Sequence, residues 1–381
     1  MAVLKGPRVL ILAGEASGDL YGGALAVALK ERLPDAEMVG TGGPRMKDAG
    51  VELLAGLDEL AVMGFAEVLP RLGFFWKLER RITQLLANSS VALMVAIDYP
   101  GFNLRIARAA HRRGVPVLYY VAPQVWAWRP ERARVLAEVA DHVAVILPFE
   151  VDFLKPYGVR ATFVGHPLLD REKEPAAPAA DRAAFSRHWG LDAERPLLAL
   201  LPGSRAQETR RHIAVFAEAA RLVQRARPDV LPVLARVTTL PAAAYEREGL
   251  PVVDDARGLL RHARVALVKS GTGTLEAAVA STPTVVAYRT SAATWALAKR
   301  LVRVAHIALP NLVAGERIVP EHVQEAATPE RLAQDLLPLF ADGAERARQL
   351  EGFSRMRESL GTPGAAGRVA DLAIGLLGSR R

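Results

Sequence analysis

Residues 264–289 contain the clearest structural pattern in the chain. An apolar run at 265–268 indicates a buried strand, and the turn Lys-Ser-Gly-Thr-Gly-Thr follows it. A short helix is expected at 275–280, and a second apolar strand comes after it. Free backbone N–H groups and the dipole at such a helix N-terminus suit a bound phosphate. The pattern fits equally well an ordinary strand–turn–helix in which Ser270 or Thr272 caps the helix.

Apolar strands alternate with helical patterns along most of the chain, which predicts parallel sheets with helices on both faces. We expect strands at residues 8–13, 37–39, 91–97, 115–121, 143–147 and 162–164, then at 197–201, 231–235, 251–253, 265–268 and 284–287. Helices are expected between them, for example at 22–32, 102–113, 129–138 and 213–225.

A charged stretch rich in Pro and Ala interrupts this alternation and indicates a linker at 170–182. The chain of 381 residues is long enough for two domains. We therefore expect an α/β protein with two Rossmann-like domains facing a cleft and a helical C-terminal tail. The expected boundaries are 1–169 for the first domain, 183–345 for the second and 346–381 for the tail.

The composition excludes several kinds of chemistry. The chain has no cysteine, which rules out a disulfide scaffold, iron–sulfur clusters and thiol catalysis, and fits a reducing cytoplasm. None of the eight histidines pairs at metal-ligand spacing, and no Asp-x-Asp is present. We therefore expect no metal and no cofactor, so that any diphosphate chemistry relies on arginine, backbone N–H groups and helix dipoles.

The net charge is +8 and the sequence pI about 9.9, which suits anionic partners such as nucleic acid, acidic lipid or phosphorylated substrates. The arginine content is equally explained by nucleotide composition. No stretch approaches the roughly 18 apolar residues of a membrane span. The apolar run at 9–13 is too short for a signal peptide, and a first strand is expected there.

A glycine-rich turn, GEASGDLYGG, follows this first strand. It matches neither the dinucleotide fingerprint nor the P-loop. A turn at the carboxyl end of a parallel strand nevertheless lies where open α/β sheets bind ligands. Ser17 and Asp19 can contact a substrate there, or either one can merely cap the next helix.

Asp98 ends the strongly apolar strand at 91–97. Partial burial at the carboxyl edge of a central strand raises the basicity of a carboxylate, which suits a general base. The alternative is that Asp98 caps the helix beginning near Phe102. We favour the base.

Two loops in the second half carry further candidates. Gly203, Ser204 and Arg205 follow the strand at 197–201 and form a compact anion site for a diphosphate, unless Arg205 is only a surface residue at a helix start. Asn311 lies in the loop LPNLVAGE, whose polar residues can reach the same site.

Three consecutive aromatics, Phe74, Phe75 and Trp76, cannot all face inward on one helix. The basic residues beside them suggest an interfacial membrane anchor on anionic lipid. These basic residues are Lys77, Arg80 and Arg81. A half-buried core position or a protein interface explains the aromatics as well.

Taken together, the motifs resemble the lipid-A-disaccharide synthase family of GT-B glycosyltransferases. The resemblance runs from about residue 9 to beyond residue 318. In chain order the motifs are GEASGDLYGG, GTGGPRM, VMGFAEVLP, IDYPGFN, YYVAPQVWAWRPER, ILPFE, FVGHPLLD, LLPGSRAQE, KSGTGTLE and LPNLVAGE.

The resemblance implies an inverting enzyme that joins UDP-2,3-diacylglucosamine to 2,3-diacylglucosamine 1-phosphate and releases UDP. It implies a peripheral protein on the cytoplasmic face of the inner membrane. Asp98 matches the family's base, and Arg205 and Asn311 match its sensitive Arg and Asn. The implied nucleotide site comprises Gly203, Ser204, Arg205, Ser270, Gly271, Thr272, Gly273, Thr274 and Glu276. The implied acceptor site comprises Ser17, Asp19, Met63, Phe65 and Glu67.

Two positions depart from the family pattern: Gly101 stands where Asp is frequent, and Gly315 lies in a loop that is usually more polar. Two other functions stay open. One is a different UDP-sugar enzyme on the same fold, such as a non-redox epimerase. The other is a non-enzymatic basic protein that binds membrane or RNA, although no aromatic-interleaved RNA motif is present, so we expect no nucleic-acid partner. An oligomer is compatible with the sequence.

Overall fold

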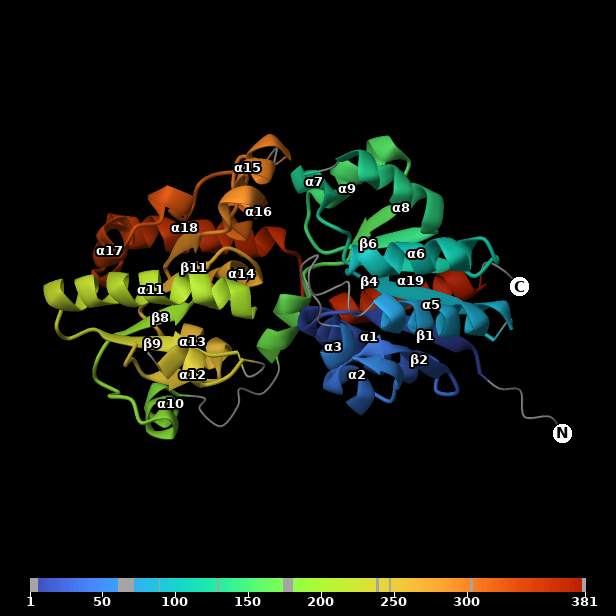
Figure 1. The fold of residues 1–381 in the computed structure, drawn as a ribbon, viewed down its shortest axis with the longest axis horizontal. Helices are drawn as coiled ribbons and strands as arrows, with labels where there is room; N and C mark the ends of the chain where they lie inside the picture. Colours follow the sequence, from blue (N-terminus) through green and yellow to red (C-terminus); the bar gives the residue numbers. More distant parts are fainter. Residues whose placement is uncertain are drawn as a thin grey trace. The chain divides into compact units, whose positions relative to one another are not determined.

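The computed structural model describes residues 6–60, 72–88, 90–128, 130–173, 181–237, 240–246, 248–301 and 304–378 (Figure 1). The chain divides into two compact units. The first contains Met1–Asp170 and Gly361–Arg381, and the second contains Arg171–Leu360. The expected linker at 170–182 begins at this boundary, and its residues 174–180 lie outside the described ranges.

In the described part of the first unit, seven parallel strands form one sheet in the order β3-β2-β1-β4-β5-β6-β7. The strands are β1 (Arg8–Ala13), β2 (Glu37–Gly42), β3 (Glu52–Gly56), β4 (Leu93–Ile97), β5 (Val117–Tyr120), β6 (His142–Val145) and β7 (Ala161–Phe163). The central strand β4 reads LMVAI and is buried at every position, as expected for a parallel strand covered on both faces. The strand order reverses between β1 and β4, where open α/β sheets bind ligands.

Helices cover both faces of this sheet (Figure 1). They are α1 (Ala16–Arg32), α2 (Pro44–Asp48), α3 (Leu57–Leu60), α5 (Leu72–Ala87), α6 (Pro100–His111), α7 (Val125–Trp128), α8 (Ala133–Val139), α9 (Glu150–Leu154) and α19 (Ala365–Gly378), with 3₁₀ turns η2 (Pro130–Arg132), η3 (Lys155–Tyr157) and η4 (Pro167–Lys173). Helix α5 packs on α6, and α6 packs on α8. Leu78, Ile82 and Leu86 of α5 recur at helical spacing and are buried in the core.

The second unit repeats the architecture with a six-stranded parallel sheet over its described residues, in the order β10-β9-β8-β11-β12-β13. Its strands are β8 (Leu197–Leu201), β9 (Leu231–Ala235), β10 (Val252–Val253), β11 (Val265–Lys269), β12 (Thr284–Tyr288) and β13 (Glu321–Val323). Its helices are α10 (Arg182–Trp189), α11 (Ala206–Ala226), α12 (Ala243–Glu246), α13 (Ala256–His262), α14 (Thr272–Val279), α15 (Ala292–Leu301), α16 (Leu309–Ala314), α17 (Pro329–Leu336) and α18 (Ala344–Ser359), with 3₁₀ turns η5 (Gln324–Ala326) and η6 (Leu337–Phe340). The order reverses between β8 and β11. The predicted α/β class with two parallel-sheet domains is confirmed.

The C-terminal segment belongs to both units. Helix α18 packs on α14 and α16 in the second unit, whereas α19 returns to the first unit and packs on α1. Asp170 accepts hydrogen bonds from Ala365 N at 3.3 Å and Ala366 N at 3.4 Å, and so caps α19. The segment expected as one tail at 346–381 is therefore divided, because tertiary contacts assign its two helices to different units.

No helix among the described residues is long and apolar enough to cross a membrane.

Candidate functional site

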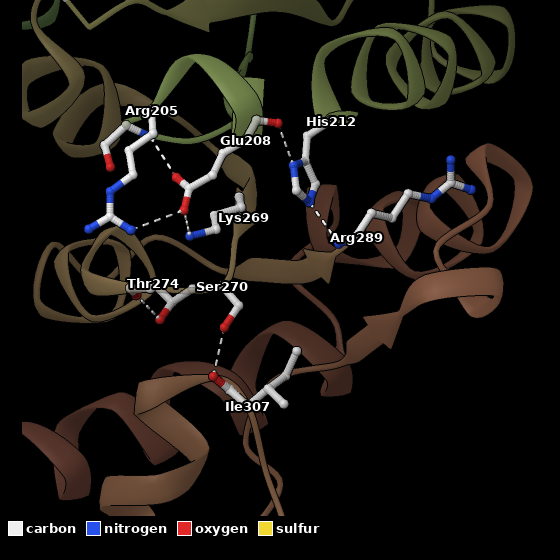
Figure 2. A network of polar contacts seen from close by, with 10 residues as sticks. Arg205, Glu208, His212, Lys269, Ser270, Thr274, Arg289 and Ile307 are labelled. Atoms are coloured by element: carbon white, nitrogen blue, oxygen red, sulfur yellow. Dashed lines mark hydrogen bonds and ion pairs between the residues drawn. The ribbon is translucent and has the colours of Figure 1, made fainter. Parts of the chain in front are cut away.

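Two glycine turns lie at the carboxyl edge of the second sheet, and Figure 2 shows the polar side chains beside them. One follows β8 and the other follows β11, and these strands are hydrogen-bonded neighbours. Lys269 of β11 donates to Glu208 Oε1 of α11 at 2.7 Å, which ties the start of α11 to the end of β11. The strand order thus brings together the two segments that the sequence predicted for a diphosphate.

The turn after β11 leads into α14 without a side-chain cap. Gly271 is the N-cap, with φ of 147° that favours glycine. Ser270 Oγ donates instead to Ile307 O at 2.7 Å, and Thr274 Oγ1 donates to Gly271 O at 2.7 Å (Figure 2). The alternative in which Ser270 or Thr272 caps the helix is therefore wrong. The backbone geometry leaves the N-terminus of α14 suited to an anion.

The turn after β8 is organised around Glu208. Gly203 has φ of 136°, and a Cβ there would lie 2.6 Å from Glu208 Cβ, so glycine is required. Ser204 N donates to Glu208 Oε2 at 3.2 Å, and Arg205 Nη1 lies 3.8 Å from Glu208 Oε1. The Arg205 side chain is 43% exposed. Its guanidinium therefore lies beside the turn and retains access to solvent.

The Glu208–Lys269 pair is largely buried, with 17% and 14% of the side chains exposed. Burial acts to raise the pKa of Glu208, but the Lys269 ammonium reverses this and holds that pKa below its usual value. His212 lies on the other side of the network: Nδ1 donates to Glu208 O at 2.7 Å, and Nε2 accepts from Arg289 N at 2.9 Å. Burial lowers the pKa of His212, which keeps the ring neutral. No local sequence pattern predicts the Glu208–Lys269 pair or the hydrogen bonds of His212, because the partners are distant in the chain or belong to the backbone.

Glu276, predicted from the sequence as part of the nucleotide site, lies one turn into α14, where a carboxylate can accept hydrogen bonds from a ribose. Its carboxylate is 3.6 Å from Arg171 Nη1, and 27% of its side chain is exposed. Burial raises the pKa of Glu276, while the charges of Arg171 and Arg257 lower it. The ribose contact stays a prediction.

Asn311 is fully buried in α16. Its Nδ2 donates to Val319 O at 3.0 Å and to Glu321 Oε1 at 2.5 Å, and its Oδ1 accepts from Ile318 N at 2.8 Å and Val319 N at 2.9 Å. Both donors and the acceptor of the amide are thus engaged within the protein. In this structure Asn311 holds the 318–321 segment, and a direct catalytic contact stays a prediction without geometric support.

Glu321 extends this connection to the nucleotide turn. Its carboxylate accepts from Ile307 N at 2.9 Å and Ala308 N at 3.2 Å. Ile307 O in turn accepts the hydrogen bond from Ser270. Hydrogen bonds therefore connect Asn311 to the predicted phosphate turn through Glu321 and the backbone of residues 307–308. An asparagine suits this position because its amide both donates and accepts.

In the first unit, Asp98 directly follows β4 and lies two residues before the start of α6. It is half-buried, and Tyr99 rather than Asp98 occupies the N-cap position of α6. Asp98 and Tyr99 have φ of 44° and 48°, and Val121 after β5 has φ of 63°. Each such non-glycine residue costs roughly 1–3 kcal/mol and tends to occur at functional sites. Backbone strain thus clusters at the neighbouring ends of β4 and β5.

A buried carboxyl group lies beyond the next strand, β6, at the first residue of α9. Glu150, at the start of α9, accepts from Trp126 Nε1 at 3.1 Å and from Leu147 N at 3.0 Å. Burial raises the pKa of Glu150 to about 7, although these hydrogen bonds oppose the shift. No local sequence pattern marks Glu150 as a buried carboxyl group.

We expect Glu150 to make stability pH-dependent. Between pH 4.5 and about 7 the unfolded chain loses the proton that the folded protein keeps, so stability falls as the pH rises through this window. At about 1.4 kcal/mol per pKa unit the loss is about 3 kcal/mol. The free energy of unfolding, measured in urea, should differ less between pH 5 and pH 7.5 for Glu150→Gln than for the wild type. Glu138→Gln, at an exposed position in α8, is the control. If the change in unfolding free energy between pH 5 and pH 7.5 were the same for Glu150→Gln and Glu138→Gln, Glu150 would not be the group responsible.

The remaining first-unit predictions have different outcomes. Asp19 is buried, and its carboxylate accepts from Gly43 N at 2.7 Å, Arg45 N at 3.1 Å and Met46 N at 3.0 Å, so it caps α2. Ser17 is half-buried in α1, whose N-cap is Glu15, so neither residue caps that helix. Acceptor contacts by Ser17 and Asp19 stay predictions. Met63, Phe65 and Glu67 lie outside the described residues.

The aromatic segment divides between core and surface. Phe74 and Phe75 of α5 are half-buried and pack against the core, whereas Trp76 is 62% exposed. Arg80 places its guanidinium 5.6 Å from the centre of the Trp76 ring. Lys77, Arg80 and Arg81 are exposed.

No group of three or more His, Cys, Asp or Glu side chains among the described residues is arranged to hold a metal ion. Independence from metal stays a prediction.

The fold is that of the GT-B class. Solved structures that share it include a putative UDP-N-acetylglucosamine 2-epimerase from Listeria monocytogenes, with 14% identity, a TM-score of 0.63 and coverage of 98% of this chain and 96% of that one. The calicheamicin glycosyltransferase has 19% identity, a TM-score of 0.60 and coverage of 99% and 100%. Identities this low show the fold alone.

Residues 9–364 match the family described as lipid-A-disaccharide synthetase. A lipid-A-disaccharide synthase from Trichlorobacter lovleyi is 41% identical over 384 residues, 99% of each chain. Another, from Myxococcus xanthus, is 39% identical over 379 residues, 97% of this chain and 98% of that one. The chain belongs to the lipid-A-disaccharide synthase family and is a glycosyltransferase of lipid A biosynthesis, which confirms the resemblance found in the sequence.

Proposed function

We propose that the enzyme transfers 2,3-diacylglucosamine from UDP to the 6-hydroxyl of 2,3-diacylglucosamine 1-phosphate. The products are the β-1,6-linked disaccharide 1-phosphate and UDP. The family match over residues 9–364 carries this proposal. The two glycine turns at the edge of the second sheet and the carboxylate at the edge of the first support it.

The proposed mechanism is a single displacement with inversion. Asp98 takes the proton from the 6-hydroxyl while this oxygen forms a bond to the anomeric carbon. The bond from that carbon to the diphosphate oxygen breaks on the opposite face, and UDP leaves with the electron pair. Arg205 and the N-terminus of α14 stabilise the negative charge on the diphosphate. No metal or cofactor takes part in the proposed reaction.

The direct test is incubation of the purified enzyme with both lipid substrates, with and without EDTA, followed by mass analysis. The disaccharide 1-phosphate and UDP should form at equal rates in both samples, with β configuration at the new linkage. An isomerised UDP-sugar without disaccharide would favour an epimerase. Activity that is lost in EDTA and restored by magnesium would refute the metal-independent mechanism.

We expect Arg205→Ala to weaken UDP binding. A charge-assisted hydrogen bond contributes roughly 1.5–3 kcal/mol, which corresponds to about tenfold or more in affinity. Calorimetric titration with UDP measures the effect. Arg221→Ala is the matched control, because Arg221 lies roughly four turns along α11, the helix that Arg205 precedes, and pairs with Glu218 and Glu248. Equal affinities for the two variants would place the diphosphate elsewhere.

We further propose that α5 docks the enzyme on the cytoplasmic face of the inner membrane. Among its exposed side chains, the large apolar ones are Leu72 at 51% and Trp76 at 62%, and the basic residues of the same helix lie beside them. Apolar burial at the interface and attraction to anionic lipid add together.

The variant Leu72→Ser/Trp76→Ser should bind anionic phospholipid vesicles at least about tenfold more weakly, since burying one large apolar side chain contributes about 1.5–3 kcal/mol. Vesicle co-sedimentation measures this. Val27→Ser removes a 50% exposed apolar side chain from α1 and should leave binding unchanged. Undiminished binding by the double variant would assign docking to another surface.

A further inference from the structure

The backbone carbonyl of Asp98 accepts hydrogen bonds from two buried side chains. Asn103 Nδ2, on α6, lies 2.8 Å from Asp98 O, and Tyr119 Oη, on β5, lies 2.8 Å from the same oxygen. Asn103 is 1% exposed, and Tyr119 is fully buried. Two donors from different elements therefore converge on the peptide group that follows β4.

The orientation of the Asn103 amide is set by its surroundings. Besides Asp98 O, Nδ2 lies 3.1 Å from Ile97 O and 3.2 Å from Leu12 O. A flipped amide would place its oxygen against three carbonyl oxygens, so only the NH₂ group fits there. The Oδ1 atom is buried and has no hydrogen-bond partner within the described part of the chain. The Asn103 side chain thus leaves its oxygen unsatisfied, while its NH₂ group faces the end of β4 and the neighbouring strand β1.

Tyr119 reaches the same carbonyl from the adjacent strand. Strands β4 and β5 pair in parallel, and Asp98 N continues the pairing by donating to Tyr120 O at 3.0 Å. Burial and then the nearby Asp98 charge raise the pKa of Tyr119 well above its ordinary value, so its hydroxyl stays protonated and donates. The peptide groups on both sides of Asp98 are therefore fixed.

This fixation matters because the backbone at Asp98 and Tyr99 is left-handed, a region that non-glycine residues seldom adopt in succession. The direction of a side chain follows from its backbone angles. We propose that Asn103 and Tyr119 are positioning residues that hold Asp98 in the left-handed conformation and so direct its carboxylate toward the acceptor hydroxyl. This inference rests on the proposed role of Asp98 as the base.

Tyr119→Phe tests the inference with little change in shape. We expect kcat to fall about 10- to 100-fold, as for a misplaced catalytic group, while KM for both substrates stays within about twofold. Tyr120→Phe is the matched control: Tyr120 is the next residue on β5 and equally buried, and its hydroxyl makes no hydrogen bond to any residue that the structure describes. That variant should retain wild-type kcat. Thermal unfolding of both variants shows whether each remains folded.

A double-mutant cycle of Tyr119→Phe and Asp98→Asn separates an effect on the position of the Asp98 carboxylate from general structural damage. If Tyr119 acts through the Asp98 carboxylate, Tyr119→Phe should not lower the residual rate of Asp98→Asn further. An equal loss of rate in both backgrounds, or a kcat for Tyr119→Phe equal to that of Tyr120→Phe, would overturn the inference. Near wild-type turnover in Asp98→Asn alone would instead refute the base assignment.

Discussion

Replacing Asp98 by asparagine should lower turnover by about 10²–10⁴-fold, the usual cost of losing a general base. Asparagine has the same shape as aspartate and tolerates the left-handed conformation that residue 98 adopts, so the backbone at the end of β4 should be preserved. The substitution therefore removes proton acceptance and little else. Turnover of the two lipid substrates by the purified variant measures the effect, and UDP titration should give the wild-type affinity because the predicted UDP residues lie in the second unit.

A carboxylate at the opposite edge of the same sheet provides the control. Asp141 precedes β6 and accepts a hydrogen bond from Val117 N at 2.8 Å, at the amino ends of the strands. Asp141→Asn should therefore affect stability slightly and leave turnover unchanged. If Asp98→Asn turned over as fast as Asp141→Asn, Asp98 would have no part in the chemistry.

The central strands were predictable because their composition decides their structure. Strands β1, β8 and β9 have the expected bounds, since parallel strands buried on both faces are continuous apolar runs. The edge strands β3 and β13 were missed. Their burial is partial, so little apolar patterning marks them, and only pairing with β2 and β12 defines them.

The candidate site was predictable only where it follows directly from a strand end. The turns after β8 and β11 were found from their glycines, and Asp98 from its place after an apolar run. The polar partners of these segments were not found, because they come from distant parts of the chain: Tyr119 lies 21 residues from Asp98, and Lys269 lies 61 residues from Glu208. For the same reason the sequence predicts Asp19 as an acceptor contact and Asn311 as a catalytic residue, but does not indicate the backbone groups to which these buried side chains bind.

The second large effect concerns the buried pair between the two turns of the second unit. Glu208→Leu should lower the free energy of unfolding by about 3 kcal/mol, because it leaves the Lys269 ammonium buried without its carboxylate. This figure is at the low end for buried pairs, since 14% of the Lys269 side chain remains exposed. Urea unfolding at pH 7 measures the loss. Glu218→Leu, on the same helix in an exposed pair with Arg221, should cost no more than about 1 kcal/mol.

The double variant Glu208→Leu/Lys269→Met decides whether the pair itself causes the loss. Removing both charges leaves no uncompensated ion, so most of the lost stability should return. If the loss in unfolding free energy of the double variant equals the sum of the losses of the two single variants, Glu208 and Lys269 contribute independently, and the ion pair does not join the turns. Recovery would show that the charge on Lys269 is what requires a carboxylate at position 208. The same carboxylate accepts from Ser204 N and lies beside Arg205, so the pairing that stabilises the second unit also fixes the geometry of the predicted diphosphate turn.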